Sequence, residues 1–525
     1  MRASRTDPLL LILVLVAALL LFGSLSGRSL WQDEAETALL AKSILASGRP
    51  IVFDGRNLVS QEAGREFGPD LLWRWSPWLQ YYVAAVSIVL CGGTTFAARL
   101  PFALLGLITV PLTWRLARRL FGSPAVTRLS ALFLVASVPF VLHARQARWY
   151  SLIDLALVGL LLCAVEMRRH RWLPAAGFVV AGVVAFYSNY FVATGILVAI
   201  LVAAPILDSR RAFLVRLVLA EAIVGLAAIP GILFFDPFGK EKASGAVKAA
   251  AQLWYDLCSY WTFALPLPVL ALVLCLVVRR PNGDETAEWR RPAAFLVALS
   301  LAYLIFIAFG PWVMFRYVSV LVPPAAILIA VGAAWLLGRW RHVGMAAAIL
   351  LAATNAIHLA PLGYLGLPGT VPADNYPRGS RIGSPLLGYL HELIHPPRDP
   401  ERVVAAYLDD HARPEDVVMA TYGDLPLQFY TGLKIVGGLQ GGPLPVDPDW
   451  ILIRQFMMGP EPGKDSDVFQ FIRSRIDPGL YRMVRLEAKD FKLGNAPDPE
   501  FHLFREPEAG PPLLLLHRRS DRPGG

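Results

Sequence analysis

Long apolar segments separated by short polar loops fill the first 361 residues of the chain. About eleven of these segments approach the ~20 residues that a helix needs to cross a bilayer. The pattern therefore predicts a polytopic α-helical membrane protein with about eleven transmembrane helices. The expected spans are residues 8–27, 97–114, 125–143, 150–166, 172–189, 191–207, 214–235, 261–278, 292–310, 317–337 and 343–361.

One further apolar run, residues 75–90, sets the orientation of everything that follows it. If this run crossed the membrane, the cluster Arg115, Arg118 and Arg119 and every later basic loop would lie outside the cytoplasm. If it lies in the interface, all these clusters lie in the cytoplasm, as the positive-inside rule requires. Its tryptophan and tyrosine residues also suit an interfacial helix. We therefore predict a first extracytoplasmic loop over residues 28–96 that contains interfacial helices.

The pattern changes after residue 361, where glycine and proline become frequent. Residues 362–400 predict an extended connection. A helical stretch at 399–411, an apolar run at 416–421 and a helix near 425–430 then precede short β-rich runs, which predicts a small α/β domain. The odd number of spans places this domain, residues 362–525, outside the cytoplasm, after a transmembrane domain of residues 1–361. The strand-like runs are residues 450–454, 481–486, 501–504 and 513–516.

Composition agrees with this membrane assignment. Of the 525 residues, 55% are hydrophobic, and the mean hydropathy of +0.50 is too high for a soluble protein of this size. The net charge of +9 is carried by the loops and reflects topology, and no interleaving of basic and aromatic residues indicates nucleic-acid binding. The four cysteines lack the spacing of a zinc site or a disulfide framework. We expect a multi-pass protein of the inner (plasma) membrane.

An acidic motif stands directly after the first span, in the sequence SLWQDEAETALLAKSILASGRP. Asp33 and Glu34 open a short helix that Gly48 and Pro50 end. Asp33 with Glu36 has the spacing of a capping box, so the acids could serve only to satisfy free N–H groups of the helix. The residues alone do not decide between a helix cap and a chemical role for these acids.

Three segments together resemble a known superfamily. The Trp-x-Asp-Glu-Ala segment at Trp31, the segment WSPWLQYY from Trp75 and the segment RLPFAL from Arg99 resemble the GT-C membrane glycosyltransferases of the protein mannosyltransferase and aminoarabinose transferase type, glycosyltransferase family 39-like. The resemblance covers about residues 8–335. In those families the aspartate of the first-loop motif is the catalytic base, which implies this role for Asp33, with Glu34 beside it as a second catalytic candidate.

The resemblance also implies a reaction. The enzyme would take a sugar from a polyprenyl-phosphate donor on the extracytoplasmic face and pass it, with inversion, to a hydroxyl. The acceptor would be a lipid, a polysaccharide or a protein. No glycine-rich nucleotide loop is evident, which agrees with a donor that is not a nucleotide sugar.

Such a transfer needs a positive group for the departing phosphate as well as a base. Four arginines are expected at the extracytoplasmic mouth of the bundle, where the positive-inside rule disfavours them. A contact with lipid headgroups is the alternative for each. Arg316 followed by Tyr317 resembles the Arg-Tyr pattern near the end of the family's membrane region, so Arg316 is the preferred phosphate ligand. The other three are Arg99, Arg145 and Arg148.

Asp154 is expected at the start of a span, where an unpartnered acid costs several kcal/mol. It either binds substrate, with Arg148 as partner, or forms a structural ion pair. Asp33 and Asp154 could also hold a divalent cation, Mg²⁺ or Mn²⁺. Tyr82 and Lys42 complete the expected substrate-binding residues, although Lys42 lies about two and a half helical turns beyond Asp33 and is expected to be solvated.

Two other classes of function stay open. A transporter or flippase would carry charges near mid-span, broken helices and related halves. Here the expected charges gather at one face, and the sequence shows no matching halves. A non-catalytic scaffold whose α/β domain binds a cell-wall component would make Asp33 dispensable.

Overall fold

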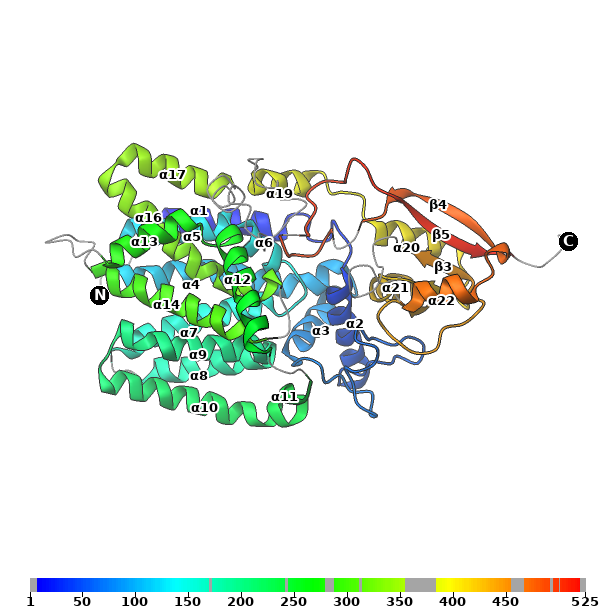
Figure 1. The fold of residues 1–525 in the computed structure, drawn as a ribbon, viewed down its shortest axis with the longest axis horizontal. Helices are drawn as coiled ribbons and strands as arrows, with labels where there is room; N and C mark the ends of the chain where they lie inside the picture. Colours follow the sequence, from blue (N-terminus) through cyan, green and yellow to red (C-terminus); the bar gives the residue numbers. More distant parts are fainter. Residues whose placement is uncertain are drawn as a thin grey trace.

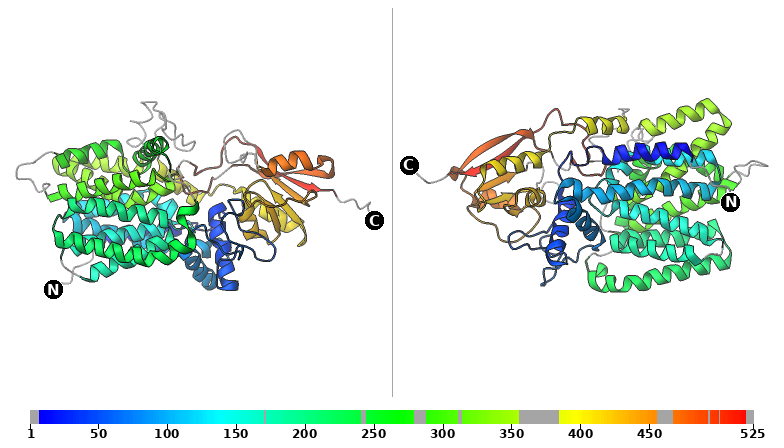
Figure 2. Two further views of the ribbon diagram at one scale, coloured as in Figure 1. Left: turned by 60° about the horizontal axis from the view of Figure 1, so that its bottom comes forward. Right: turned by 180° about the vertical axis from the view of Figure 1, so that it is seen from behind.

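A computed structural model describes residues 7–169, 172–240, 244–278, 288–310, 314–354, 384–454, 467–491, 494–499 and 501–519. A bundle of apolar helices stands beside a smaller region built on a β-sheet (Figures 1 and 2). The first loop lies between the two, so it contacts both. The N-terminus is at the end of the bundle that faces away from the sheet (Figure 1).

Six helical segments within the described residues are long and apolar enough to cross a membrane, and two bent helix pairs raise the number to eight. Three shorter apolar helices also pack in the bundle, so about eleven crossings stays a prediction. The six are α4 (Thr95–Phe121), α7 (Tyr150–Met167), α9 (Tyr190–Leu207), α10 (Arg211–Phe235), α14 (Arg290–Ile307) and the run of α15 (Phe315–Val318), η2 (Ser319–Leu321) and α16 (Val322–Arg339). The shorter ones are α1 (Pro8–Phe22), α8 (Trp172–Ser188) and α17 (Arg341–Ala353).

Two of the expected spans are bent. The axis turns by 63° between α5 (Pro124–Ala136) and α6 (Val138–Ala144), and by 96° between α12 (Ala246–Phe263) and α13 (Leu267–Val278). A proline lies at each break, Pro139 and Pro266, and proline has no N–H for the helical ladder. The expectation of one span over residues 261–278 is therefore wrong. The helix α12 begins at Ala246, before the expected start of the span, and the axis then bends near Pro266.

The helices of the first loop lie at the end of the bundle, not among its helices (Figures 1 and 2). They are α2 (Gln32–Ser47) and α3 (Leu79–Cys91). Gly48 ends α2 in the left-handed conformation, at φ 77°, as the sequence predicts. Tyr81 and Trp73 are buried between these helices and the loop that joins them. That α3 lies in the membrane interface stays a prediction.

The basic loops share the opposite end of the bundle. Residues from α4, from the end of α7 and from the start of α14 line one cavity there. This grouping is the one that the predicted topology requires.

The smaller region is a five-stranded mixed sheet in the order β2-β1-β3-β5-β4. β1 pairs in parallel with β2 and β3, whereas β5 pairs antiparallel with β3 and β4. Side chains alternate along β1, so Val418 and Ala420 pack with one pair of helices and Met419 packs with α22. The elements are α20 (Pro400–His411), β1 (Val417–Ala420), α21 (Asp424–Thr431), β2 (Lys434–Gly437), β3 (Trp450–Ile453), α22 (Asp467–Arg475), η3 (Pro478–Leu480), β4 (Tyr481–Lys489) and β5 (Pro512–Arg518).

Three features of the C-terminal region differ from the sequence prediction. β2 was not predicted, and residues 501–504 form no strand. The expected extended connection contains the helix α19 (Pro385–Ile394), which packs on the bundle through Tyr389; residues 362–383 lie outside the described residues. Phe504 packs beside α19 in the same apolar core. Residues 501–504 thus pack against the bundle and do not join the sheet. An alternating apolar pattern can arise from such packing without a strand.

We predict that the basic end of the bundle faces the cytoplasm and that the sheet lies outside it. Cysteine introduced at Ala125 or at Ser474, both exposed, distinguishes the two sides in a background that lacks the four native cysteines. A membrane-impermeant maleimide added to intact cells should label the position 474 variant and not the position 125 variant. Labelling of position 125 from outside, with labelling of lysed cells as the control, would reverse the assignment.

Candidate active site

Asp33 lies in the first turn of α2, at the end of the bundle next to the first loop. The residue that precedes this helix is Trp31, and no side chain caps it. Oδ2 of Asp33 instead accepts a hydrogen bond from Nη1 of Arg316 at 2.7 Å. The capping-box alternative is therefore wrong. Oδ1 accepts no hydrogen bond from any described residue, and the side chain stays 17% exposed.

Arg316 is held by a second carboxylate, which comes from the C-terminal region. Nη2 and Nε of Arg316 donate to Oδ2 of Asp498 at 2.7 and 3.1 Å. Oδ1 of the same carboxylate accepts the backbone N–H of Arg316 at 2.8 Å. Burial would raise the pKa of Asp498, but the charges of Arg316 and His143 outweigh it and lower the pKa to about 2. Arg316 thus bridges two acids that are 465 residues apart in the chain.

The segment that carries Asp498 is fastened to the bundle on both sides. Nδ2 of Asn495 donates to the backbone oxygen of Ser29 at 2.9 Å, and His502 contacts Glu392 at 2.7 Å. Arg28 also binds Glu392, at 3.1 Å. Burial would raise the pKa of Glu392, but His502 and Arg28 lower it to about 2. A carboxylate with a lowered pKa stabilises the fold above its ordinary pKa and loses this contribution as the pH falls toward 2.

Arg148 flanks Asp33 on its other side. Its Nη2 lies 3.7 Å from Oδ2 of Asp33, and its Nη1 donates to Oε1 of Glu36 at 2.6 Å. Glu36 also accepts hydrogen bonds from Gln61 at 2.6 Å and Tyr81 at 3.1 Å. Burial raises the pKa of Glu36, against the charge of Arg148. The first loop therefore fixes Arg148 through Glu36, a residue that the sequence had suggested only as part of a helix cap.

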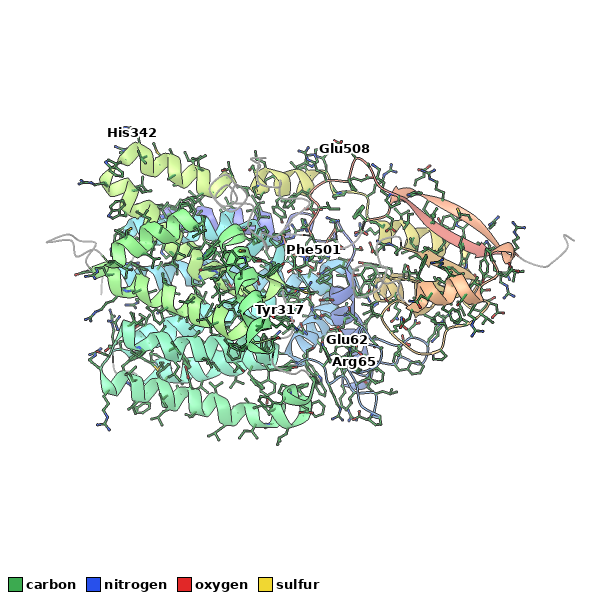
Figure 3. The ribbon with its side chains drawn as sticks, viewed as in Figure 1. Glu62, Arg65, Tyr317, His342, Phe501 and Glu508 are labelled. Atoms are coloured by element: carbon green, nitrogen blue, oxygen red, sulfur yellow. The ribbon has the colours of Figure 1, made fainter. Side chains whose placement is uncertain are left out.

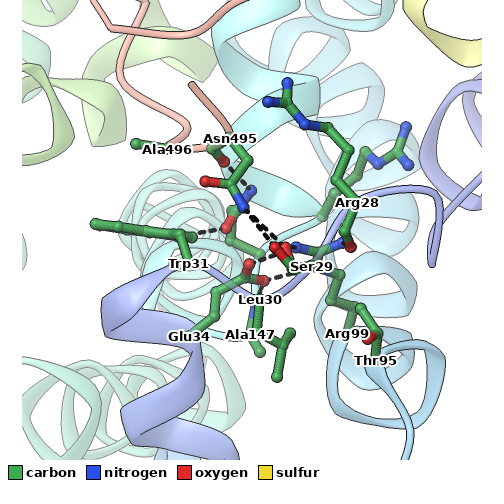
Figure 4. A network of polar contacts seen from close by, with 12 residues as sticks. Arg28, Ser29, Leu30, Trp31, Glu34, Thr95, Arg99, Ala147, Asn495 and Ala496 are labelled. Carbon is green, nitrogen blue, oxygen red and sulfur yellow. Dashed lines mark hydrogen bonds and ion pairs between the residues drawn. The ribbon is translucent and has the colours of Figure 1, made fainter. Parts of the chain in front are cut away.

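Glu34 and Arg99, expected as a catalytic group and a phosphate ligand, bind each other instead. Nε and Nη2 of Arg99 donate to the two oxygens of Glu34 at 2.8 and 2.5 Å, and the N–H of Ala147 donates to Oε1 at 2.8 Å (Figure 4). The remaining nitrogen of Arg99 binds the backbone oxygens of Leu25 and Arg28. The Glu34 side chain is completely buried. Both side chains are thus nearly buried, and their charged groups are satisfied by each other and by backbone groups.

The other expected residues lie apart from Asp33. Lys42 stacks on the ring of Phe429 at 3.8 Å, and Tyr82 donates to the backbone oxygen of Gly48 at 3.0 Å. Asp154 is buried one turn below Tyr150 on α7. Among the described residues, Arg148 forms ion pairs with Glu36 and Asp33 and none with Asp154. Arg145, the fourth candidate arginine, binds Tyr389 and backbone oxygens of α1 and the turn after it.

Tyr150 is a site residue that the sequence did not single out. It lies in the first turn of α7 and is 1% exposed. The charges of Arg316, Asp498 and Asp33 lie close enough to act on its hydroxyl group. That hydroxyl has no hydrogen-bond partner among the described residues. His143 stacks edge-on against the ring at 4.9 Å, and its Nδ1 contacts the oxygen of Pro139 at 2.8 Å.

A mostly apolar cavity of about 780 Å³ opens beside these charges. Tyr317, which the sequence predicts to bind substrate, lines this cavity together with Trp149 and Phe191. Arg148 also lines the cavity. The polar end of the cavity is therefore formed by the arginine that lies beside Asp33. Figure 3 places Tyr317 at the end of the bundle that faces the first loop. Pockets of about 300–1,000 Å³ with a few placed polar groups are typical of small-molecule sites.

The predicted metal site does not fit these surroundings. No group of three or more His, Cys, Asp or Glu side chains in the described part of the chain could hold a metal ion. Asp33 faces the guanidinium groups of Arg316 at 2.7 Å and Arg148 at 3.7 Å, and two positive charges at these distances repel a cation. No chemical step is therefore assigned to a metal at Asp33 and Asp154.

Comparisons with known proteins agree with this architecture. A sequence profile of the family described as dolichyl-phosphate-mannose-protein mannosyltransferase matches residues 76–234, less than a third of the chain. No protein of curated function matches the sequence significantly.

Two crystal structures of ArnT from Cupriavidus metallidurans share the fold. The apo structure is 16% identical, with a TM-score of 0.60, and the match covers 98% of each chain. The structure bound to undecaprenyl phosphate is 15% identical, with a TM-score of 0.58, and covers 97% of this chain and 98% of that one. The chain therefore shares the fold of these two ArnT structures over nearly its whole length.

We predict that Glu34→Gln destabilises the protein because it leaves the charge of Arg99 buried without a counter-ion. Removing one partner of a buried ion pair costs about 3–5 kcal/mol. Glu62→Gln is the matched control, because its partner Arg65 is 70% exposed and such pairs contribute about 0–1 kcal/mol. Denaturant unfolding of the purified proteins measures both. Equal stability of the two variants would show that Glu34 is not the buried counter-ion described here.

Proposed function

We propose that this protein is an extracytoplasmic glycosyltransferase of the inner (plasma) membrane that uses a polyprenyl-phosphate sugar donor. The observation that carries the proposal is the position of Asp33. Its Oδ2 lies between two arginines, one of which lines an apolar cavity, and its Oδ1 accepts no hydrogen bond from the described residues. A base, a pair of phosphate ligands and a compartment for a lipid tail thus meet at one point.

The two arginines suit the phosphate of the donor. A guanidinium group offers planar pairs of donors that match phosphate oxygens. Arg148 lines the apolar cavity and Arg316 lies on the other side of Asp33. A polyprenyl chain that lies along Trp149 and Phe191 would bring its phosphate to Arg148 first. An ArnT structure that shares this fold is bound to undecaprenyl phosphate, which supports this class of carrier.

The reaction follows as a single displacement at the anomeric carbon. The acceptor hydroxyl attacks this carbon from the face opposite the phosphate, so a new carbon–oxygen bond forms with inversion. The bond between carbon and the phosphate oxygen breaks, and polyprenyl phosphate leaves with the electron pair. Oδ1 of Asp33 takes the acceptor proton. Arg316 and Arg148 stabilise the charge that grows on the leaving phosphate.

Three acids position these groups. Asp498 and Glu36 hold the guanidinium groups of Arg316 and Arg148. Both arginines are therefore already ordered before the phosphate binds. Glu34 anchors the start of α2, through Arg99 and the N–H of Ala147, and thereby fixes Asp33 one residue away. The hydroxyl of Tyr150 is the remaining polar atom, and we assign it to a substrate oxygen.

The transporter alternative fits the charges less well. Bent helices occur at Ser137 and near Pro266, as a transporter would have them. The charged cluster, however, joins α2, the turn before α7, α15 and the C-terminal segment at the end of the bundle. A route for a solute would need such groups along the membrane interior.

We predict that Asp33→Asn nearly abolishes transfer while folding and donor binding persist. The amide keeps the shape of the side chain but cannot accept the acceptor's proton, and loss of such a group typically costs about 10²- to 10⁴-fold. Transfer from a radiolabelled polyprenyl-phosphate sugar, measured with monodisperse protein, tests this. Asp70→Asn, in the exposed pair with Arg74 of the same loop, is the control and should keep full activity. An Asp33→Asn protein as active as its parent would rule Asp33 out as the base.

We predict that Tyr150→Phe lowers transfer without lowering stability. The hydroxyl has no partner among the described residues, so its removal breaks no hydrogen bond. Tyr260→Phe is the matched control, because the Tyr260 hydroxyl donates to Ser300 at 3.2 Å and its loss should cost about 1 kcal/mol. Thermal unfolding and transfer rates are measured for both. Unchanged transfer in Tyr150→Phe would show that its hydroxyl does not meet the substrate.

A further inference from the structure

A second large cavity, of about 820 Å³, lies at the opposite end of the bundle from Asp33. It is an open hollow lined by the ends of α4, α7 and α9 and the start of α14. These helix ends lie at the end of the bundle away from the sheet (Figure 1). Besides apolar residues, one glutamate lines it, Glu288. Its other charged residues are the arginines Arg115, Arg118, Arg119, Arg168, Arg169 and Arg291.

The charge in this cavity is not balanced by the described residues. Arg119 pairs with Glu166 at 2.8 Å, and Arg168 pairs with Asp208 at 3.4 Å. Once these two pairs and the charge of Glu288 are discounted, three positive charges remain in excess. Guanidinium groups that share one concave space repel one another unless an anion lies between them.

Topology alone does not explain this arrangement. The positive-inside rule favours arginines at this end of the bundle, but it acts on loops and does not collect them around one cavity. Arg211 and Arg341 show the ordinary case, since they stand at helix starts and do not line the cavity. Most of the arginines that line the cavity are exposed as well, so the two sets differ in the concave space that the lining arginines share.

Apolar surface continues from the mouth of the cavity along the bundle. Leu207 and Phe121 line the cavity, and on α9 the side chains of Ile206 and Val202 are 39% and 59% exposed. Apolar side chains exposed on a candidate membrane span face lipid. An anion that enters this cavity from the membrane would keep its acyl chains against α9. Basic pockets between membrane helices typically bind anionic lipid headgroups of this kind.

We infer that this cavity is a binding site for the headgroup of an anionic phospholipid with two phosphate groups. Two phosphates carry close to the charge that the cavity lacks, and several guanidinium groups can bind each phosphate in pairs. The inference concerns the end of the bundle away from the transfer site, and it does not depend on the proposed activity.

Lipid binding by the purified full-length protein tests the inference. Native mass spectrometry and thermal unfolding are measured in neutral detergent with cardiolipin, with phosphatidylcholine and with soluble pyrophosphate. We expect one tightly bound cardiolipin per chain and stabilisation by cardiolipin alone. The double variant Arg118→Gln, Arg169→Gln should bind cardiolipin at least about tenfold more weakly, since it loses two charge-assisted contacts. The double variant Arg211→Gln, Arg341→Gln removes the same charge outside the cavity and should bind like the parent.

Three results would overturn the inference. An equal loss of cardiolipin affinity in the two double variants would show that the basic end of the bundle attracts the lipid without a specific site. Equal stabilisation by phosphatidylcholine would show no selectivity for the anion. Binding of pyrophosphate at the same strength as cardiolipin would assign the cavity to a soluble polyphosphate. If the glutamine variant does not fold, Arg118→Lys with Arg169→Lys keeps the charge and removes the paired donors, and unchanged binding in that protein would equally contradict the site.

Discussion

The rest of the active end of the molecule depends on the nearly buried guanidinium group of Arg316. A charge in this position is costly to remove from water, and it is tolerated only with close counter-ions and satisfied hydrogen bonds. Asp33 and Asp498 supply them, at 2.7 Å each. One acid comes from the first loop and the other from the C-terminal segment. The requirement to neutralise one arginine therefore ties the two ends of the chain to the mouth of the bundle.

This requirement gives the small C-terminal region a place in the site. Its sheet lies beyond the first loop, but residues 494–499 and 501–504 return to the bundle, where Asn495, Asp498 and His502 make polar contacts. Asp424 of α21 also binds Gln32, in the first turn of α2, at 2.8 Å. The acidic helix that begins with Gln32 is thus held from both sides. Its position is fixed by contacts that neither the bundle nor the sheet could make alone.

Much of this architecture could be predicted from the sequence, because membrane helices and basic loops leave strong local patterns. The apolar spans, the end of α2 at Gly48 and several strands follow from such patterns. The pairing of Glu34 with Arg99 could not be predicted, since two adjacent acids look alike in sequence and differ only in what lies opposite each. Asp498 gave no signal either, because it lies in an irregular segment and its partner is 182 residues away. Tyr150 lies between Arg148 and Asp154, two residues that the sequence singled out, but an unpartnered buried hydroxyl is visible only in three dimensions.

The central claim is that Arg316 holds the phosphate of a polyprenyl carrier beside Asp33. Binding of polyprenyl phosphate to purified Arg316→Lys protein tests it most directly, because lysine keeps the charge but cannot form two parallel bonds to phosphate. Arg128→Lys, in the exposed pair with Asp7, is the control. The account predicts a loss of about 1.5–3 kcal/mol in Arg316→Lys, roughly ten- to a hundredfold in Kd, and no change in the control. Equal affinity of Arg316→Lys and its parent would contradict the account.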